Sequence, residues 1–380
     1  MHDARKEYFP ALTGLRAVAV FLVLVHHFNP ISPAQFGWRL HSLAAETHVG
    51  VTVFFVLSGF LISYRYLGAG PVALRTYFIN RFARIYPLYF LLTTLTFVLV
   101  ASKSAAPWAE QLGQYLLNIS FLRGFFEEYI YTGIAQGWSL TVEEMFYATA
   151  PAAFWFLRRS RHWLWGLPLT LTAAGVGLVL LCRGQAWHGF FGSFDFLFQF
   201  TYLGRAVEFF VGIGLAWWLR QSLALELSSR SVYTYVGLVG SLACLLMLSL
   251  LHGPVVGALG VFRPAGMFIN NVLLPLLGIG PLLWGLVQEQ TWVSRLLSSA
   301  PLVLLGKSSY AFYLIHLGVL QELLRDWLPN AVVPMLLLYV VSVLLYLLIE
   351  EPLNRWLRRV LRPASARHIE EALKHAPRTA

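Results

Sequence analysis

Residues 9–29 read FPALTGLRAVAVFLVLVHHFN, a run long and apolar enough to cross a lipid bilayer as one helix. This run nevertheless carries Arg16, His26 and His27. A charged group inside a span costs roughly 3 kcal/mol on insertion scales and normally marks a pathway or a site. At ~100° per residue, the steps from Arg16 to His27 return almost to the same helix face, about 16 Å further along. We therefore expect Arg16 and His27 to face one groove, and His26 to point about 100° away from it.

Composition extends the membrane assignment to the rest of the chain. Of 380 residues, 58% are hydrophobic and only 12% are charged, about half the charged share of a soluble domain. Backbone polar groups in lipid must bond internally, and the apolar runs lack the alternation of a β-barrel, so they predict helices. The predicted fold is all-α, a polytopic integral membrane protein of about ten spans. These spans lie near residues 9–28, 49–67, 85–102, 139–157, 163–182, 201–219, 232–252, 269–288, 309–324 and 331–350.

The net charge of +10 follows the predicted topology. Most Lys and Arg residues fall in alternate loops and in the polar stretch after the last span. By the positive-inside rule these segments, and both termini, are cytoplasmic. The charge is therefore an orientation signal, and we expect no nucleic-acid partner. Cys182 and Cys244 lie in apolar spans without paired spacing, which predicts neither a disulfide framework nor a thiolate metal site.

A basic pair precedes the third predicted span. Arg81 and Arg84 are three residues apart, so on a helix their guanidinium groups share one face. Two converging guanidinium groups at a membrane edge suit a phosphate, which each binds through paired hydrogen bonds. Anchoring of the helix to lipid headgroups explains the same pair at least as well from spacing alone.

A polar stripe opens the fourth predicted span. Ser139, Glu143 and Tyr147 recur every four residues and share one helix face, with Glu144 beside them. Carboxylates within a span are costly unless they meet a cation or a substrate, so this stripe favours a functional role. The structural alternative is a partnership with a buried arginine.

Other polar residues have plainer interpretations. His41 and His48, in the first external loop, are interpreted as solvated or packing residues. Arg205 and Glu208 are three residues apart and are expected to pair with each other. His316, alone at mid-membrane depth, is more typical of a hydrogen-bonded packing residue than of a catalyst.

A small spot at Ser58-Gly59 allows another helix, or a ligand, to approach closely. Together with the features above, it belongs to a series of motifs that resembles the membrane acyltransferase family 3, the bacterial multi-span O-acyltransferases. The most specific motif is Arg, ten intervening residues and His, met by Arg16 and His27. The others follow in the family's order: FFVLSGF at 54–60, RxxR at 81–84, WSLxxE at 138–143, SYxxYxxH at 309–316 and Glu-Pro at 351–352.

The resemblance covers about residues 8–362. It makes 1–362 one acyltransferase-like transmembrane domain, followed by a polar cytoplasmic tail at 363–380, a stand-alone member without an esterase-like domain after the last span. Many family members have an acidic residue where this chain has Thr52, so no carboxylate role is carried over to that position.

The resemblance implies an O-acyltransferase of the bacterial inner membrane. Acyl-CoA, in the simplest case acetyl-CoA, enters from the cytoplasm with its phosphates on Arg81 and Arg84, and its pantetheine arm passes Arg16. A hydroxyl of a carbohydrate acceptor arrives from the outer side. His27 is expected to act as general base on that hydroxyl, help that is typically worth about 10²–10⁴-fold in rate. Acyl-CoA is a co-substrate, and no bound cofactor or metal is expected.

Several site assignments stay open at this point. Glu143 is expected to orient or charge the His27 imidazole, with Glu144 as the alternative carboxylate. A covalent acyl-histidine is an alternative to general-base catalysis. The expected supporting residues are Ser58, Trp138, Ser139, Glu144, Tyr147 and His316.

The rival class of function is a transporter or flippase. Intramembrane Arg, His and Glu residues mark proton and sugar pathways equally well. Many transporters contain paired repeats, however, and this sequence shows none. An enzyme is therefore preferred, while the identity of the acceptor, the acyl chain length and the oligomeric state are not predicted.

Overall fold

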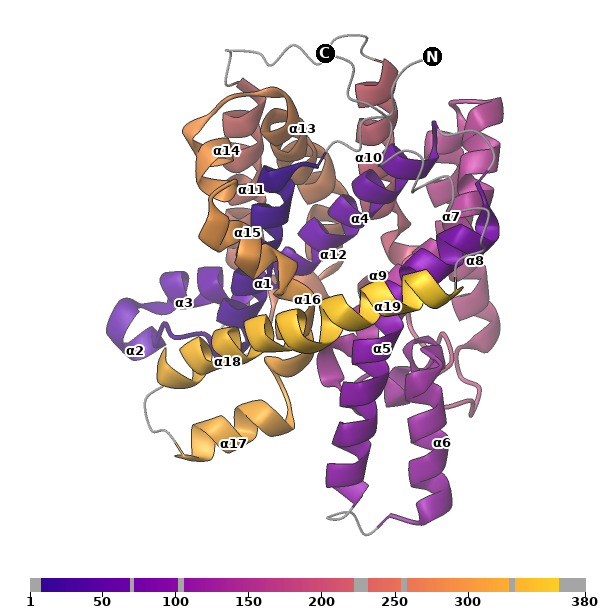
Figure 1. Ribbon diagram of the computed structural model, residues 1–380, viewed down its shortest axis with the longest axis vertical. Coiled ribbons are helices and arrows are strands. Elements are labelled where there is room, and N and C mark those ends of the chain that lie inside the picture. The colour runs from indigo at the N-terminus through magenta and orange to yellow at the C-terminus, as the bar shows by residue number, and fades with distance from the viewer. Residues whose placement is uncertain are drawn as a thin grey trace.

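The computed structural model describes residues 8–68, 72–101, 106–221, 232–253, 258–327 and 332–361 (Figure 1). Within these ranges the chain is helical and holds no β-strand, which confirms the all-α prediction. The predicted tail at 363–380 lies outside the described residues. The α-helices are α1 (Pro10–Phe28), α2 (Pro33–Phe36), α3 (Trp38–Ala45), α4 (Gly50–Tyr66), α5 (Leu74–Ala101), α6 (Trp108–Ile119), α7 (Trp138–Arg159), α8 (Trp163–Cys182), α9 (Phe194–Phe200), α10 (Tyr202–Gln221), α11 (Val232–Leu251), α12 (Pro264–Phe268), α13 (Gly280–Gln288), α14 (Trp292–Leu297), α15 (Ala300–Lys307), α16 (Ser309–Ile315), α17 (Val319–Trp327), α18 (Val332–Leu345) and α19 (Glu351–Leu361).

Tighter and wider helical turns join several of these helices. The 3₁₀ segments are η1 (Glu46–Val49), η2 (Leu122–Phe125), η3 (Glu127–Tyr129), η4 (Ala135–Gly137) and η5 (Gly260–Phe262). The π-helical segments are η6 (Ile269–Ile279) and η7 (Tyr346–Glu350). Through η6 and η7 the chain continues from α12 into α13 and from α18 into α19. The second of these stretches, yellow in Figure 1, runs across the molecule past the Glu351-Pro352 motif.

Eight helical stretches within the described ranges are long and apolar enough to cross a membrane, judged by length and composition. They are Pro10–Phe28, Trp38–Tyr66, Leu74–Ala101, Trp163–Cys182, Phe194–Gln221, Val232–Leu251, Pro264–Gln288 and Val333–Leu361. The predicted count of ten is not confirmed.

Two predicted spans account for the difference. The 139–157 prediction corresponds to α7, which is 22 residues long but carries Glu143 and Glu144 among its apolar residues. The 309–324 prediction was wrong as a single helix, because α16 ends at Ile315. The chain then turns at Gly318, whose φ of +97° is a conformation that L side chains rarely adopt, before α17 begins.

Helix α1 lies at the centre of the packing, against α4, α14, α15 and α16. Close approach depends on glycine at a few points. On α4, a Cβ at Gly59 would lie 2.1 Å from the carbonyl oxygen of Phe209 on α10, so only glycine fits there. The Ser58-Gly59 spot is therefore a helix-packing contact at Gly59, while the neighbouring Ser58 faces a cavity.

Candidate active site

Two cavities lie along α1, one near each of its ionisable positions. We call them the arginine cavity and the histidine cavity. The arginine cavity is lined by, among others, Arg16, Phe54, Ser58, Arg81, Arg84, Ser139, Glu143, Tyr147 and Tyr310. The histidine cavity is lined by, among others, His26, His27, His48, Tyr131, Gln136, Trp138, Gln199, Arg205, Asn270 and Asn271.

Val51 and Tyr313 line both cavities, so they form the wall between them. The single groove expected for Arg16 and His27 is therefore divided at this wall. His26, expected to point elsewhere, lines the histidine cavity beside His27. Helical spacing alone gave His26 and His27 different directions. It did not account for the segment after α1, where the Ala45 carbonyl oxygen contacts His26 and holds that ring beside His27.

Arg16 carries a buried guanidinium without a protein acceptor. Within the described part of the chain, its Nε is fully buried and has no hydrogen-bond partner. Its guanidinium carbon lies 5.9 Å from the centre of the Phe54 ring. A buried cation without a partner is costly, so this arrangement suits an anionic or strongly polar ligand in the arginine cavity.

The two arginines of the RxxR motif differ in what they contact. Arg84 Nη1 lies 2.5 Å from Glu350 Oε1, and the Glu350 side chain is 2% exposed. Arg81 packs over the Tyr147 ring, 5.5 Å from its centre, and its buried Nε has no partner among the described residues. The free guanidinium groups of this cavity are thus those of Arg16 and Arg81, because Arg84 already has a carboxylate.

Glu143 belongs to the arginine cavity. Its Oε1 accepts a short hydrogen bond from Ser58 Oγ and another, of 2.5 Å, from Tyr147 OH. Glu144 lines neither cavity, so of the two adjacent glutamates it is Glu143 that faces the site. His27 lines the other cavity, and the structure does not bring Glu143 to it.

The start of α7 supplies residues to both cavities. Trp138 lines the histidine cavity, and Ser139 lines the arginine cavity. Ser139 Oγ lies 2.7 Å from the hydroxyl oxygen of Tyr313, which in turn donates to the backbone oxygen of Gln136 at 3.0 Å. These bonds hold the Tyr313 phenol in the wall between the cavities.

Three histidines near the C-terminal end of α1 each have one ring nitrogen in a hydrogen bond. His26 Nδ1 donates to the Ala45 carbonyl oxygen at 2.5 Å, and His316 Nδ1 donates to that of Tyr313 at 2.8 Å. His48 Nε2 donates to the Glu46 carboxylate at 3.0 Å. Carbonyls and carboxylates only accept, so each contact fixes which nitrogen carries the proton.

His27 is the exception. Within the described ranges no hydrogen bond holds its imidazole, which is exposed and lines the cavity. Its ring lies between two others, with centroids 4.6 Å from His26 and 5.3 Å from His316. An accessible imidazole without a protein partner is available to exchange a proton with a ligand.

The pairing expected for Arg205 and Glu208 is confirmed, with Arg205 Nη2 2.8 Å from Glu208 Oε1. The same nitrogen donates to Thr52 Oγ1 at 3.0 Å. This pair also forms part of the histidine cavity, because Arg205 lines it. The packing interpretation of His41 agrees with its burial and its 2.7 Å contact with the Ile31 carbonyl oxygen.

Sequence reasoning missed several cavity residues. His48 was interpreted as a solvated or packing residue, Tyr313 entered only as part of the motif at 309–316, and the amides of the histidine cavity were not singled out. The amide pair Asn270-Asn271 interrupts an apolar stretch, and that signal was visible in the sequence. Within the described ranges no group of three or more His, Cys, Asp or Glu residues has the geometry to hold a metal ion.

The chain is similar in sequence to several known acyltransferases. It is 28% identical to the acyltransferase MdmB of Streptomyces mycarofaciens in an alignment 334 residues long that covers 82% of this chain and 79% of MdmB. It is 25% identical to the O-acetyltransferase OatA of Staphylococcus aureus over 375 residues, 93% of this chain and 57% of OatA. The chain spans about half the length, 51%, of other Staphylococcus aureus relatives. No solved structure matches it. A family model described as an acyltransferase domain matches residues 9–351, nearly the whole chain, and the protein belongs to this acyltransferase family.

Proposed function

We propose that this protein is a membrane O-acyltransferase that moves an acyl group, in the simplest case acetyl, from acyl-CoA to a hydroxyl of a carbohydrate acceptor. The observation that carries the proposal is the division of the site at Val51 and Tyr313. Unpartnered guanidinium groups lie on one side of this wall and an unpartnered imidazole lies on the other. An anionic donor suits the first cavity, and an acceptor that must lose a proton suits the second.

The arginine cavity supports an acyl-CoA as donor. CoA carries phosphates, and guanidinium groups bind phosphate through paired, charge-assisted hydrogen bonds. Arg81 and Arg16 both line this cavity, and among the described residues neither forms an ion pair with a carboxylate, so both suit an anion. In this proposal Arg81 takes a phosphate, Arg16 contacts the donor further in, and Arg84 acts mainly through Glu350, holding the cavity wall.

The histidine cavity supports a carbohydrate as acceptor. Trp138 and Tyr131 provide aromatic surface, which suits the C–H faces of a sugar ring. Gln136 Oε1 and Gln199 Nε2 are buried without partners among the described residues, leaving one acceptor and one donor for hydroxyl groups. The hydroxyl groups of a sugar both donate and accept hydrogen bonds. A bound sugar would therefore remove the free-energy cost of leaving these two buried amide atoms without partners.

The proposed reaction joins the two cavities at the wall. The thioester of the bound donor reaches past Val51 and Tyr313 into the histidine cavity. His27 takes the proton of the acceptor hydroxyl as its oxygen attacks the thioester carbonyl carbon. The carbon–sulfur bond then breaks, and the CoA thiolate receives the proton from the His27 imidazolium. Products are the acyl ester and free CoA, and the imidazole returns to its neutral form.

The proposed setting is the bacterial inner membrane, with multiple spans in the lipid bilayer. The distribution of Lys and Arg supports a cytoplasmic origin for α1. Arg16, nearer the beginning of α1, then lies on the cytoplasmic side, and His27 at its end lies on the outer side. Acyl-CoA is made in the cytoplasm, so this orientation gives the donor and acceptor opposite entrances. A transport pathway would need a conduit wide enough for a whole solute, whereas acyl transfer needs only the thioester arm to pass the wall at Val51 and Tyr313.

The test uses membranes of the source bacterium, so that the natural acceptor is present. Radiolabelled acetyl-CoA is supplied to membranes carrying either the wild-type protein or His27→Ala, and base-labile label is counted in the glycan fraction. We expect labelled glycan with the wild type and none above background with His27→Ala. Equal labelling in both membranes, or none in either, would overturn the proposal.

A further inference from the structure

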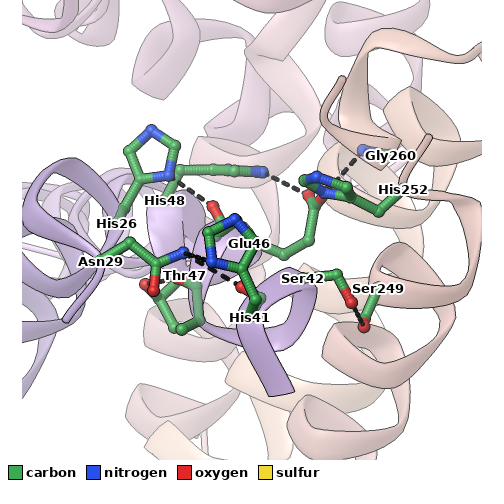
Figure 2. Close-up of polar contacts among 12 residues, drawn as sticks. His26, Asn29, His41, Ser42, Glu46, Thr47, His48, Ser249, His252 and Gly260 are labelled. Atoms are coloured by element: carbon green, nitrogen blue, oxygen red, sulfur yellow. Dashed lines mark hydrogen bonds and ion pairs between the residues drawn. The ribbon is translucent and has the colours of Figure 1, made fainter. Parts of the chain in front are cut away.

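Glu46 is a fully buried carboxylate that contacts His48, a residue lining the histidine cavity (Figure 2). It begins η1, between α3 and α4, and its two oxygens have different partners. Oε1 accepts from His252 Nδ1 at 2.8 Å and from the Gly260 backbone N at 2.5 Å. Oε2 accepts from His48 Nε2 at 3.0 Å. The charge is therefore shared between two groups of partners.

The Oε1 contacts are structural. His252 follows the end of α11 and Gly260 begins η5, so this oxygen joins η1 to two segments more than 200 residues further along the chain. The His252 side chain is fully buried, and His252 does not line the histidine cavity. Packing of these segments explains why a carboxylate is buried here, but it does not require a third donor from the cavity.

The partner of Oε2, His48, lines the histidine cavity. The His48 ring lies edge-on to that of His26, with ring centroids 5.4 Å apart and planes at 86°. His26 in turn lies 4.6 Å from His27, again edge-on. A buried negative charge is thus connected through two imidazole rings to His27, whose imidazole has no hydrogen-bond partner within the described ranges.

Adjacent residues fix both intervening rings. Ala45 accepts from His26, and Glu46 accepts from His48, so the junction of α3 and η1 sets the position and the protonated nitrogen of each ring (Figure 2). Glu143, the carboxylate that the sequence assigned to His27, is bound to Ser58 and Tyr147 in the other cavity.

We propose that Glu46 is the positioning carboxylate of His27, acting through His48 and His26. This inference rests on the acyl transfer proposed above. The two rings pack against the His27 imidazole and hold its orientation. When His27 takes the acceptor's proton it becomes a cation, and the negative charge of the buried Glu46 stabilises that cation across the two intervening rings. The phosphates of the donor bind in the other cavity, so donor binding does not depend on this support.

The experiment measures initial rates of acetyl transfer in source-bacterium membranes over a range of acetyl-CoA concentrations. In Glu46→Gln we expect kcat to fall about tenfold with KM for acetyl-CoA unchanged, since support of the transition state is lost without loss of donor binding. His48→Gln should have a similar effect. In the double variant the losses should not add, because both residues act along one path.

Two variants control for structural damage. His252→Gln disturbs the Oε1 side of Glu46 and the ring contact of His252 with Trp38, but leaves the His48 contact in place. We expect it to lower thermal stability in detergent while keeping kcat. Glu289→Gln removes another buried carboxylate, which accepts from the backbone N of Tyr233 and Thr234 at the start of α11 and lines neither cavity. We expect this variant also to keep kcat.

The outcomes separate the two proposals. Inactive wild-type protein, or an active His27→Ala, removes the proposed function and this inference with it. If His27→Ala is inactive while Glu46→Gln keeps wild-type kcat, only the role of Glu46 is refuted. It is refuted equally if His252→Gln loses as much kcat as Glu46→Gln at matched stability, or if the Glu46 and His48 losses multiply.

Discussion

The arginine cavity and the histidine cavity are built in different ways. The arginine cavity takes its polar groups from the interiors of long helices, where short motifs on α1, α4, α5 and α7 place them on one face. The histidine cavity takes its groups largely from helix ends and from the short segments η1 and η4. The residues of the arginine cavity can therefore be predicted from their spacing along each helix. The residues of the histidine cavity come together only through the packing of segments that are distant in sequence.

The comparison predicts opposite kinetic defects, and the largest is at His27. We expect His27→Ala to lower kcat by about 10²–10⁴-fold, the usual contribution of a general base. Binding of acetyl-CoA, measured by isothermal titration in detergent, should stay within about twofold of wild type because the donor occupies the other cavity. His26→Ala is the matched control on the same helix and should cost far less. A large loss of acetyl-CoA affinity in His27→Ala would contradict the separation of the two cavities.

The next largest effect is on stability, at the ion pair of Arg84 and Glu350. Removing one partner of a buried pair leaves an uncompensated charge, which typically costs about 3 kcal/mol. Arg84→Ala should therefore lower the thermal midpoint in detergent clearly, although Arg84 itself is 21% exposed. Adding Glu350→Gln to this variant should restore much of the loss. An additive double variant would show that the pair contributes little.

Local spacing explains which parts of the site were predictable. The cost of a charge in lipid singled out Arg16 and His27, and helical periodicity placed Glu143 and Tyr147 on one face. Spacing gives a direction around a helix, but it does not identify the neighbouring helix. The contact of Glu143 with Ser58 was therefore not predictable, and its proposed role beside His27 was not supported.

Long-range pairing explains what was missed. Arg84 and Glu350 are 266 positions apart, so no local pattern joins them. The same holds for Glu46 with His252. The break after α16 has a local cause instead, the positive φ of Gly318. The all-α class followed from composition alone, whereas the number of spans depended on where such breaks fall.

A smaller effect separates Arg81 from Arg84. Arg81 has no carboxylate partner among the described residues, so Arg81→Ala should weaken acetyl-CoA binding about tenfold, the loss of one charge-assisted contact. The stability of this variant should be near wild type. Arg84→Ala, by contrast, should reduce stability more than affinity. Unchanged acetyl-CoA affinity in both variants, measured by titration, would remove the phosphate role from this motif.

The smallest expected effect is that of removing one hydroxyl, at Tyr313 in the wall that both cavities share. Tyr313→Phe keeps the ring but removes the hydroxyl that contacts Ser139 Oγ and the Gln136 backbone oxygen. Leaving such buried groups unmet costs about 1–3 kcal/mol of stability, and the ring should then move more freely. Because the ring still divides the cavities, we expect kcat to fall only a few-fold, with acetyl-CoA affinity kept.

Val51→Trp tests the same wall by filling it. The added volume lies between the cavities, so acetyl transfer should stop while acetyl-CoA still binds in the arginine cavity. Isothermal titration measures acetyl-CoA binding, and the membrane labelling assay measures acetyl transfer by the same variant. If Val51→Trp transfers acetyl groups at the wild-type rate, the acyl group does not cross at this wall, and the two cavities do not act on one reaction.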